Sequence, residues 1–88
     1  PTRRSSDLRR FSWGEVQLAL KADGGRISEL ILHTDALDTQ LVTALTEALP
    51  GTQLTKAAVA EAFRQIPAQN RLQASMKDDL ERLLGLLL

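Results

Sequence analysis

The sequence contains no cysteine, only one histidine and few aromatic residues, namely one tryptophan, two phenylalanines and no tyrosine. Without cysteine the chain has no disulfide framework, no cysteine-based zinc site and no thiol nucleophile. The single histidine, His33, cannot by itself form a multi-histidine metal site. The scarcity of aromatic side chains argues against a surface that stacks nucleobases, because such a surface needs several of them in register.

The chain also lacks an excess of charge of either sign and lacks a long hydrophobic run. Eleven Lys and Arg residues are balanced by eleven Asp and Glu residues, so the formal net charge is zero. This balance argues against a dedicated binder of nucleic acid or of anionic membranes. The longest strongly apolar run, Leu83–Leu88, is far shorter than the ~20 residues of a transmembrane helix. We therefore expect one small cytoplasmic domain with no nucleic-acid or membrane partner.

The first ten residues differ in composition from the rest. They contain four arginines against one acidic residue, Asp7, and one large apolar residue, Leu8. A segment with so little to bury does not recover the entropy lost on ordering. We therefore expect residues 1–10 to be a basic linker or arm and residues 11–88 to be the folded domain.

Two strands are predicted by residue alternation. From Glu15 to Lys21 apolar and polar residues alternate strictly, which is typical of a half-buried antiparallel strand. The adjacent glycines Gly24 and Gly25 favour a tight hairpin turn. Arg26–Thr34 is then the return strand, and its more continuous apolar run predicts a more central position in the sheet.

The period changes to that of helices from Asp38 onward, where Asp38 is the expected N-cap. Pro50-Gly51 ends the first helix; a second helix, capped by Thr55, runs to Pro67, and a third runs from about Asn70 to the C-terminus. A short edge strand around Gln53-Leu54 is a further prediction. The expected fold is α+β, an antiparallel hairpin sheet of two or three strands packed on one face by three helices.

Few side chains in this pattern suggest chemistry of their own. Asp35 and Asp38 are more simply a turn residue and a helix cap than an acid–base pair. Asp78-Asp79 is expected on a solvated helix face, and His33 at a solvent-side or boundary position. Trp13 is either a core anchor or an aromatic residue presented to a partner. The chain is therefore expected to hold no catalytic, cofactor or metal site.

One set of residues carries a resemblance to a known family. The set comprises Phe11-Ser12-Trp13-Gly14-Glu15-Val16-Gln17-Leu18 opening a strand, Gly25-Arg26-Ile27 leaving the turn, and Thr34-Asp35-Ala36-Leu37 before the first helix. In this order and spacing it resembles the small C-terminal accessory domain of lipoate–protein ligases. The resemblance covers about residues 10–63 and is weaker over the last helix. Where relatives often carry an aromatic residue after the helix-ending glycine, this chain has Leu54.

The resemblance implies a part in ATP-dependent lipoylation, in which lipoate is activated as lipoyl-AMP and then transferred to an acceptor lysine. It implies that lipoate, ATP and Mg bind to a separate catalytic domain, in the same chain or in another subunit, and that the lipoyl acceptor domain is only an indirect partner. Six residues are the predicted interdomain contact: Phe11, Trp13, Gly14, His33, Thr34 and Asp35. The alternative is a non-catalytic adaptor that binds a partner through its leucine-rich C-terminal helix, where Leu86 lies outside the main apolar stripe.

Overall fold

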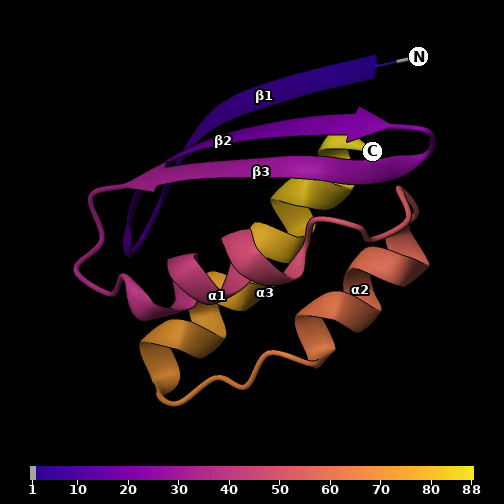
Figure 1. Cartoon of the computed structure of the whole chain (residues 1–88). Helices are drawn as coiled ribbons and strands as arrows, with labels where there is room; N and C mark the ends of the chain where they lie inside the picture. Colours follow the sequence, from indigo (N-terminus) through magenta and orange to yellow (C-terminus); the bar gives the residue numbers. More distant parts are fainter. Residues whose placement is uncertain (1) are drawn as a thin grey trace.

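The computed structural model describes residues 2–88, with side chains from residue 4 onward. Three strands form one antiparallel sheet in the order β1-β2-β3, and three helices pack against one of its faces (Figure 1). The strands are β1 (Thr2–Phe11), β2 (Gly14–Asp23) and β3 (Arg26–Thr34). The helices are α1 (Gln40–Ala48), α2 (Lys56–Arg64) and α3 (Arg71–Leu87). The predicted α+β fold with three helices on one face is confirmed.

The alternation predicted for β2 holds, because every second residue from Val16 onward points into the core. Val16, Leu18, Leu20 and Ala22 are buried, whereas Gln17 between them is exposed. The Gly24-Gly25 turn is also confirmed, with φ of 61° and 77° at the two glycines. Both central residues of such a two-residue hairpin need positive φ, which glycine adopts without strain.

The N-terminal segment differs from the sequence prediction. Instead of an arm, Thr2–Phe11 form β1 and pair with β2 in an unbroken antiparallel register from Thr2↔Asp23 to Phe11↔Gly14. Pro1 lies outside the described residues. The physical reason is that β2 would otherwise present an unpaired row of N–H and C=O groups at its edge, and a polar strand can satisfy them. Ser12 and Trp13 are the connecting turn.

The position of β3 also differs from the prediction, because β2 and not β3 is the central strand. The nearly continuous apolar run of β3 results instead from a β-bulge. Lys21 pairs with Glu29 and Ala22 pairs with Ile27, so Ser28 is an extra residue that bulges from β3. The bulge allows Ile27 and Leu30 to face the core together although three positions separate them.

The predicted strand at Gln53-Leu54 is reduced to a single bridge between Arg26 and Gln53. Backbone hydrogen bonds around it still cover the outer edge of β3, for example Ile27 N to Thr52 O at 2.8 Å and Leu54 N to Gly25 O at 2.9 Å. The third strand of the sheet is therefore supplied by the N-terminal segment and not by this loop.

Side-chain capping defines where the helices begin. The Asp38 carboxylate accepts hydrogen bonds from the backbone N–H groups of Gln40 and Leu41, so it caps α1 as predicted, although the helix itself starts at Gln40. Thr55 caps α2 and Asn70 caps α3 in the same way. The helices contribute eight buried apolar residues to a single core with the sheet, and Leu49 and Ile66 just after α1 and α2 add to it; the eight are Leu41, Leu45, Val59, Phe63, Met76, Leu80, Leu83 and Leu84.

Candidate functional site

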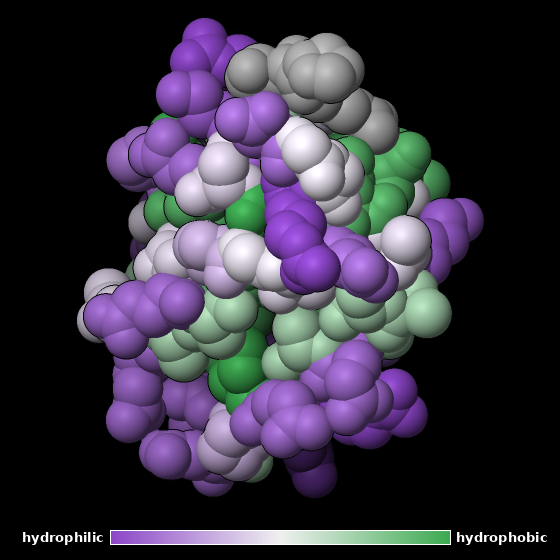
Figure 2. Space-filling model, turned by 45° about the vertical axis from the view of Figure 1, so that its right-hand side comes forward, coloured by the Kyte–Doolittle hydropathy of each residue, from purple (hydrophilic) through white to green (hydrophobic). Residues whose placement is uncertain are grey.

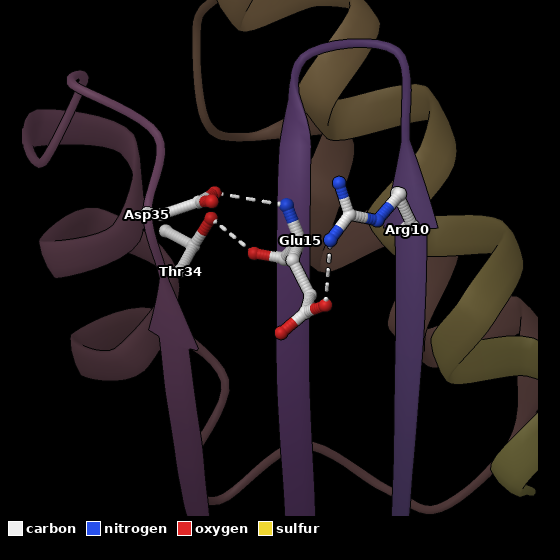
Figure 3. Close-up of polar contacts among 4 residues, drawn as sticks. All are labelled: Arg10, Glu15, Thr34 and Asp35. Carbon is white, nitrogen blue, oxygen red and sulfur yellow. Dashed lines mark hydrogen bonds and ion pairs between the residues drawn. The ribbon is translucent and has the colours of Figure 1, made fainter.

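The residues of the predicted contact set gather at one end of the sheet, where the β1–β2 turn lies beside the end of β3. At this end the Asp35 carboxylate accepts a hydrogen bond from the Glu15 backbone N–H at 2.9 Å (Figure 3). Gly14 makes this approach possible, because a Cβ at position 14 would lie 2.6 Å from Asp35 Oδ1. The backbone of Gly14 has φ of 150°, a conformation that side-chain-bearing residues rarely adopt.

Thr34 reinforces the same junction. Its hydroxyl donates a hydrogen bond to the Glu15 carbonyl at 2.7 Å and accepts one from the Ala36 backbone N–H at 3.2 Å. On the other side of β2, Arg10 reaches the Glu15 carboxylate at 3.2 Å, which ties in β1 (Figure 3). This last pair is exposed and contributes little to stability. The start of β2 is thus held on both sides, and Gly14, Thr34 and Asp35 form one rigid strand-end junction.

The two aromatic residues of the set serve as packing on the helical face of the sheet. The Phe11 and Trp13 rings stack with centroids 5.2 Å apart and planes 14° from parallel, and both are half-buried against the core. The Trp13 indole N–H donates a 2.8 Å hydrogen bond to the Asp79 carboxylate of α3. Of the two interpretations of Trp13, the core anchor is the one that these contacts favour.

Asp79 is a residue that sequence reasoning missed. The Asp78-Asp79 pair was expected on a solvated face, and this is correct for Asp78, which is exposed and pairs with Arg82 at 2.8 Å. Asp79 is instead half-buried and bonded to Trp13. The two residues point in different directions from the helix. The available signal was helical spacing, because Asp79 stands three residues after Met76 and four before Leu83, and both of these are buried.

His33 lies on the open face of the sheet, opposite the face on which Phe11 and Trp13 pack. It is exposed, and it is paired across the strands with Gln17. A shallow groove of about 230 Å³ runs over this face, lined by Leu8, Glu15, Gln17, His33, Thr34 and Asp35. Three of the six predicted contact residues therefore border one accessible surface, whereas Phe11 and Trp13 lie behind it.

The loop after β3 is tied to the N-terminus of α3 through Gln73, a buried polar residue. The Gln73 side-chain amide donates to the Asp38 carboxylate at 3.0 Å, and its carbonyl oxygen accepts from the Gln69 backbone N–H at 2.9 Å. The Gln73 amide, with the backbone N–H groups of Leu41 and Gln40, holds the pKa of Asp38 below its ordinary value. Asp38 thus caps α1, as predicted, and links the start of that helix to α3.

The described part of the chain has neither a cluster of metal-ligating side chains nor a candidate membrane span. No group of three or more His, Asp or Glu side chains within residues 2–88 is placed to hold a metal ion. None of the helices in this part is long and apolar enough to cross a bilayer.

A second hollow lies between α2 and α3, with a volume of about 290 Å³ and a lining that includes Val59, Gly85 and Leu86. Figure 2, in which the right-hand side of Figure 1 comes forward, shows many hydrophilic residues around the outline of the molecule, with hydrophobic ones between them and in a cluster at the upper right. Leu80, Leu83 and Leu84 of the leucine-rich helix are buried in the core, whereas Leu86 is exposed. Most of the apolar excess that suggested an adaptor is therefore accounted for by the core.

Comparison with known proteins agrees with this architecture. Residues 4–84 match the family described as bacterial lipoate protein ligase C-terminus. Among solved structures the fold is similar to that of P. falciparum LipL1, solved in complex with lipoate, with a TM-score of 0.80 and 17% sequence identity. That similarity covers 93% of this chain and 24% of the LipL1 chain. No curated protein matches the sequence. This chain belongs to the bacterial lipoate protein ligase C-terminus family.

Proposed function

We propose that this chain is the accessory domain of an ATP-dependent lipoate–protein ligase and that it closes over a separate catalytic domain. Closure supports the formation of lipoyl-AMP, which precedes transfer of the lipoyl group to an acceptor lysine. Family membership supports the accessory role. The structural observation that carries the proposal is the rigid junction of Gly14 with Asp35, which fixes the shape of one sheet end beside an accessible groove.

The physical benefit of such closure is the exclusion of water. Lipoyl-AMP is a mixed anhydride, and water competes with the acceptor lysine for its carbonyl carbon. A domain that covers the site when the substrates are in place lowers access of water and completes the site at the same moment. This role needs a well-defined surface and no reactive side chain of its own, which fits the side chains found at the sheet end.

The substrates and the metal belong to the partner in this proposal. Lipoate, ATP and Mg bind to the catalytic domain, which lies in the same polypeptide or in a separate subunit, and this chain binds none of them. The lipoyl acceptor domain engages the catalytic domain and meets this chain only indirectly. The short share of the LipL1 chain that is matched, 24%, is compatible with a larger catalytic part elsewhere in such ligases.

The predicted contact residues take two roles in the proposal. His33, Thr34 and Asp35 border the open groove and face the partner. The other three residues do not line the groove. Phe11, Trp13 and Gly14 instead fix the position of the β1–β2 turn against Asp35 and α3. Contact with the catalytic domain therefore depends on the whole set, although only part of it touches the partner.

The test is to add this chain to the catalytic domain of its ligase and to measure pyrophosphate release in the presence of lipoate and ATP. We expect a saturable increase in rate with increasing concentration of the chain. A Leu45→Asp variant is the matched control, because Leu45 is 1% exposed in the core and a buried charge prevents folding. A rate that stays the same with the native chain, or that rises equally with the control, rules the proposal out.

A further inference from the structure

The most exposed large apolar side chain of the described residues is Leu37, in the loop between β3 and α1. It is 98% exposed, although its neighbour Ala36 packs against the core and Leu41, four residues on, is 2% exposed. An exposed leucine contributes nothing to the stability of the fold, and its apolar surface remains in contact with water. A single exposed leucine on a mobile surface loop needs no explanation. Leu37 differs because hydrogen bonds hold the residues before and after it.

The residues on both sides of Leu37 are held in place by hydrogen bonds. Before it, the Asp35 carboxylate accepts from the Glu15 backbone N–H at 2.9 Å. After it, the Asp38 carboxylate accepts from the Gln40 backbone N–H at 3.1 Å and from the Gln73 side chain at 3.0 Å. The loop is thus anchored to β2 on one side and to α1 and α3 on the other. A side chain presented on an anchored loop loses less entropy on binding than one on a free loop.

The surroundings of Leu37 indicate what it would bind. Asp35 is exposed and has no ion pair with any residue in the described part of the chain. Asp35 also borders the groove on the open sheet face, whose lining includes Leu8, which is 58% exposed. An exposed apolar side chain two residues from a carboxylate that has no ion pair fits a partner pocket with an apolar floor and a cationic rim.

We infer that Leu37 is the apolar anchor by which this chain docks onto the catalytic domain of the ligase, an inference that rests on the proposed function. The catalytic domain is the occupant because Leu37 lies two residues beyond Asp35, at the same strand-end junction that carries the family motif. Leu37 inserts into an apolar pocket of that domain, and Asp35 meets a basic side chain at the pocket rim. Central apolar anchors of this kind account for much of the affinity of an interface.

The experiment compares two exposed leucines with the same substitution, Leu37→Ser and Leu86→Ser. Leu86 is 67% exposed and lies on the last turn of α3, where the adaptor hypothesis places the binding surface. Each variant is titrated into the catalytic domain, and the concentration that gives half-maximal pyrophosphate release is measured. We expect Leu37→Ser to raise this concentration about tenfold or more, which is the usual effect of losing an anchor residue. The rate at saturation stays near the native value, because Leu37 does not touch the reacting atoms. A Leu37→Met variant keeps an apolar side chain at this position and retains the native affinity.

The remaining outcomes separate the inference from the proposed function. Half-maximal concentrations that are equal for Leu37→Ser and the native chain, while the native chain stimulates, overturn the anchor role and leave the accessory role intact. No stimulation by the native chain removes both. A larger effect from Leu86→Ser than from Leu37→Ser moves the docking surface to α3. If sedimentation of the chain alone reveals a dimer that Leu37→Ser dissociates, then the leucine binds a second copy and the inference is wrong.

Discussion

The Asp35 carboxylate occupies the space that a side chain at position 14 would need. A Cβ built on Gly14 would lie 2.6 Å from Asp35 Oδ1, far inside van der Waals contact. The glycine and the aspartate are 21 positions apart in the sequence, yet their close approach restricts which residue type each position can hold. Their co-occurrence in the family motif therefore has a structural cause, which is the closure of the β2–β3 junction, before it has any functional one.

Gly14→Ala is expected to destabilise the fold by about 2–4 kcal/mol, since the new Cβ meets the Asp35 carboxylate and the backbone is strained as well. Urea denaturation measures the loss as a lower midpoint. Gly85→Ala is the matched control, because a Cβ at Gly85 has no atom within 4 Å and this glycine lies inside α3. It should stabilise the chain by up to about 1 kcal/mol, as alanine is the better helix former. Equal effects from the two substitutions would contradict the close approach of Asp35 to Gly14.

The elements that sequence reasoning predicted are those with a strong local signal. The alternation of β2, the glycine pair at 24–25 and the caps at Asp38 and Thr55 all depend on neighbouring residues, and all are present in the structure. The strand β1 was missed because burial was the criterion applied to it. Its order comes from backbone pairing with β2, which side-chain composition does not reveal.

The candidate site was predictable in part. The motif placed Gly14, Thr34 and Asp35 in one set, and the structure brings them together. Local sequence patterns do not predict contacts between distant residues. The hydrogen bond from Trp13 to Asp79 is such a contact, because it joins residues 66 positions apart. Leu41 belongs to the helix predicted after the Asp38 cap and is buried as that pattern indicates, whereas the exposure of Leu37, just before the cap, is seen only in the structure.

Asp79→Ala should destabilise the chain by about 1–2 kcal/mol, because it leaves the half-buried Trp13 indole N–H without its charged acceptor. Trp13 is the sole tryptophan, so its fluorescence reports this site alone. We expect the emission spectrum to shift as the indole loses its partner. Asp78→Ala is the control, because Asp78 is exposed and its pair with Arg82 is worth less than about 1 kcal/mol. An Asp79→Ala spectrum identical to the native one would show that the contact is absent in solution.

Trp13→Ala is expected to reduce lipoyl-AMP formation by the assembled enzyme, by about tenfold, while the domain remains folded. The reason is positional, since the Phe11–Trp13 stack holds the β1–β2 turn against α3 and thereby fixes the sheet end that faces the partner. Pyrophosphate release driven by lipoate and ATP measures the effect, with circular dichroism as the check on folding. Trp13→Phe keeps an aromatic ring in the stack and should lose less activity. Unchanged lipoyl-AMP formation by a folded Trp13→Ala variant would remove the hairpin turn from the proposed contact.

The pKa of Asp38 provides a prediction about pH. Hydrogen bonds from the Gln73 side chain, and then from the backbone of Leu41 and Gln40, lower this pKa from its ordinary value of 3.8. A carboxyl group whose pKa is lower in the folded state stabilises that state fully above its unfolded pKa, and the contribution is lost as the pH falls through the folded value. Gln73→Leu should therefore cost stability at pH 7, and part of that cost should disappear as the pH falls below 3.8, because protonation of Asp38 removes the charge that the Gln73 amide stabilises.

The measurement for this last prediction is urea denaturation of the native chain and of Gln73→Leu at pH 7 and near pH 2.5. Gln65→Leu is the matched control, because Gln65 is exposed and its side chain bonds only to Glu61 on the same helix. We expect the difference in the free energy of unfolding between Gln73→Leu and the native chain to shrink at the lower pH. The corresponding difference for Gln65→Leu should be small at both. A Gln73→Leu deficit that is the same at the two pH values would mean that Gln73 acts only by packing and by capping the Gln69 backbone, with no coupling to the Asp38 charge.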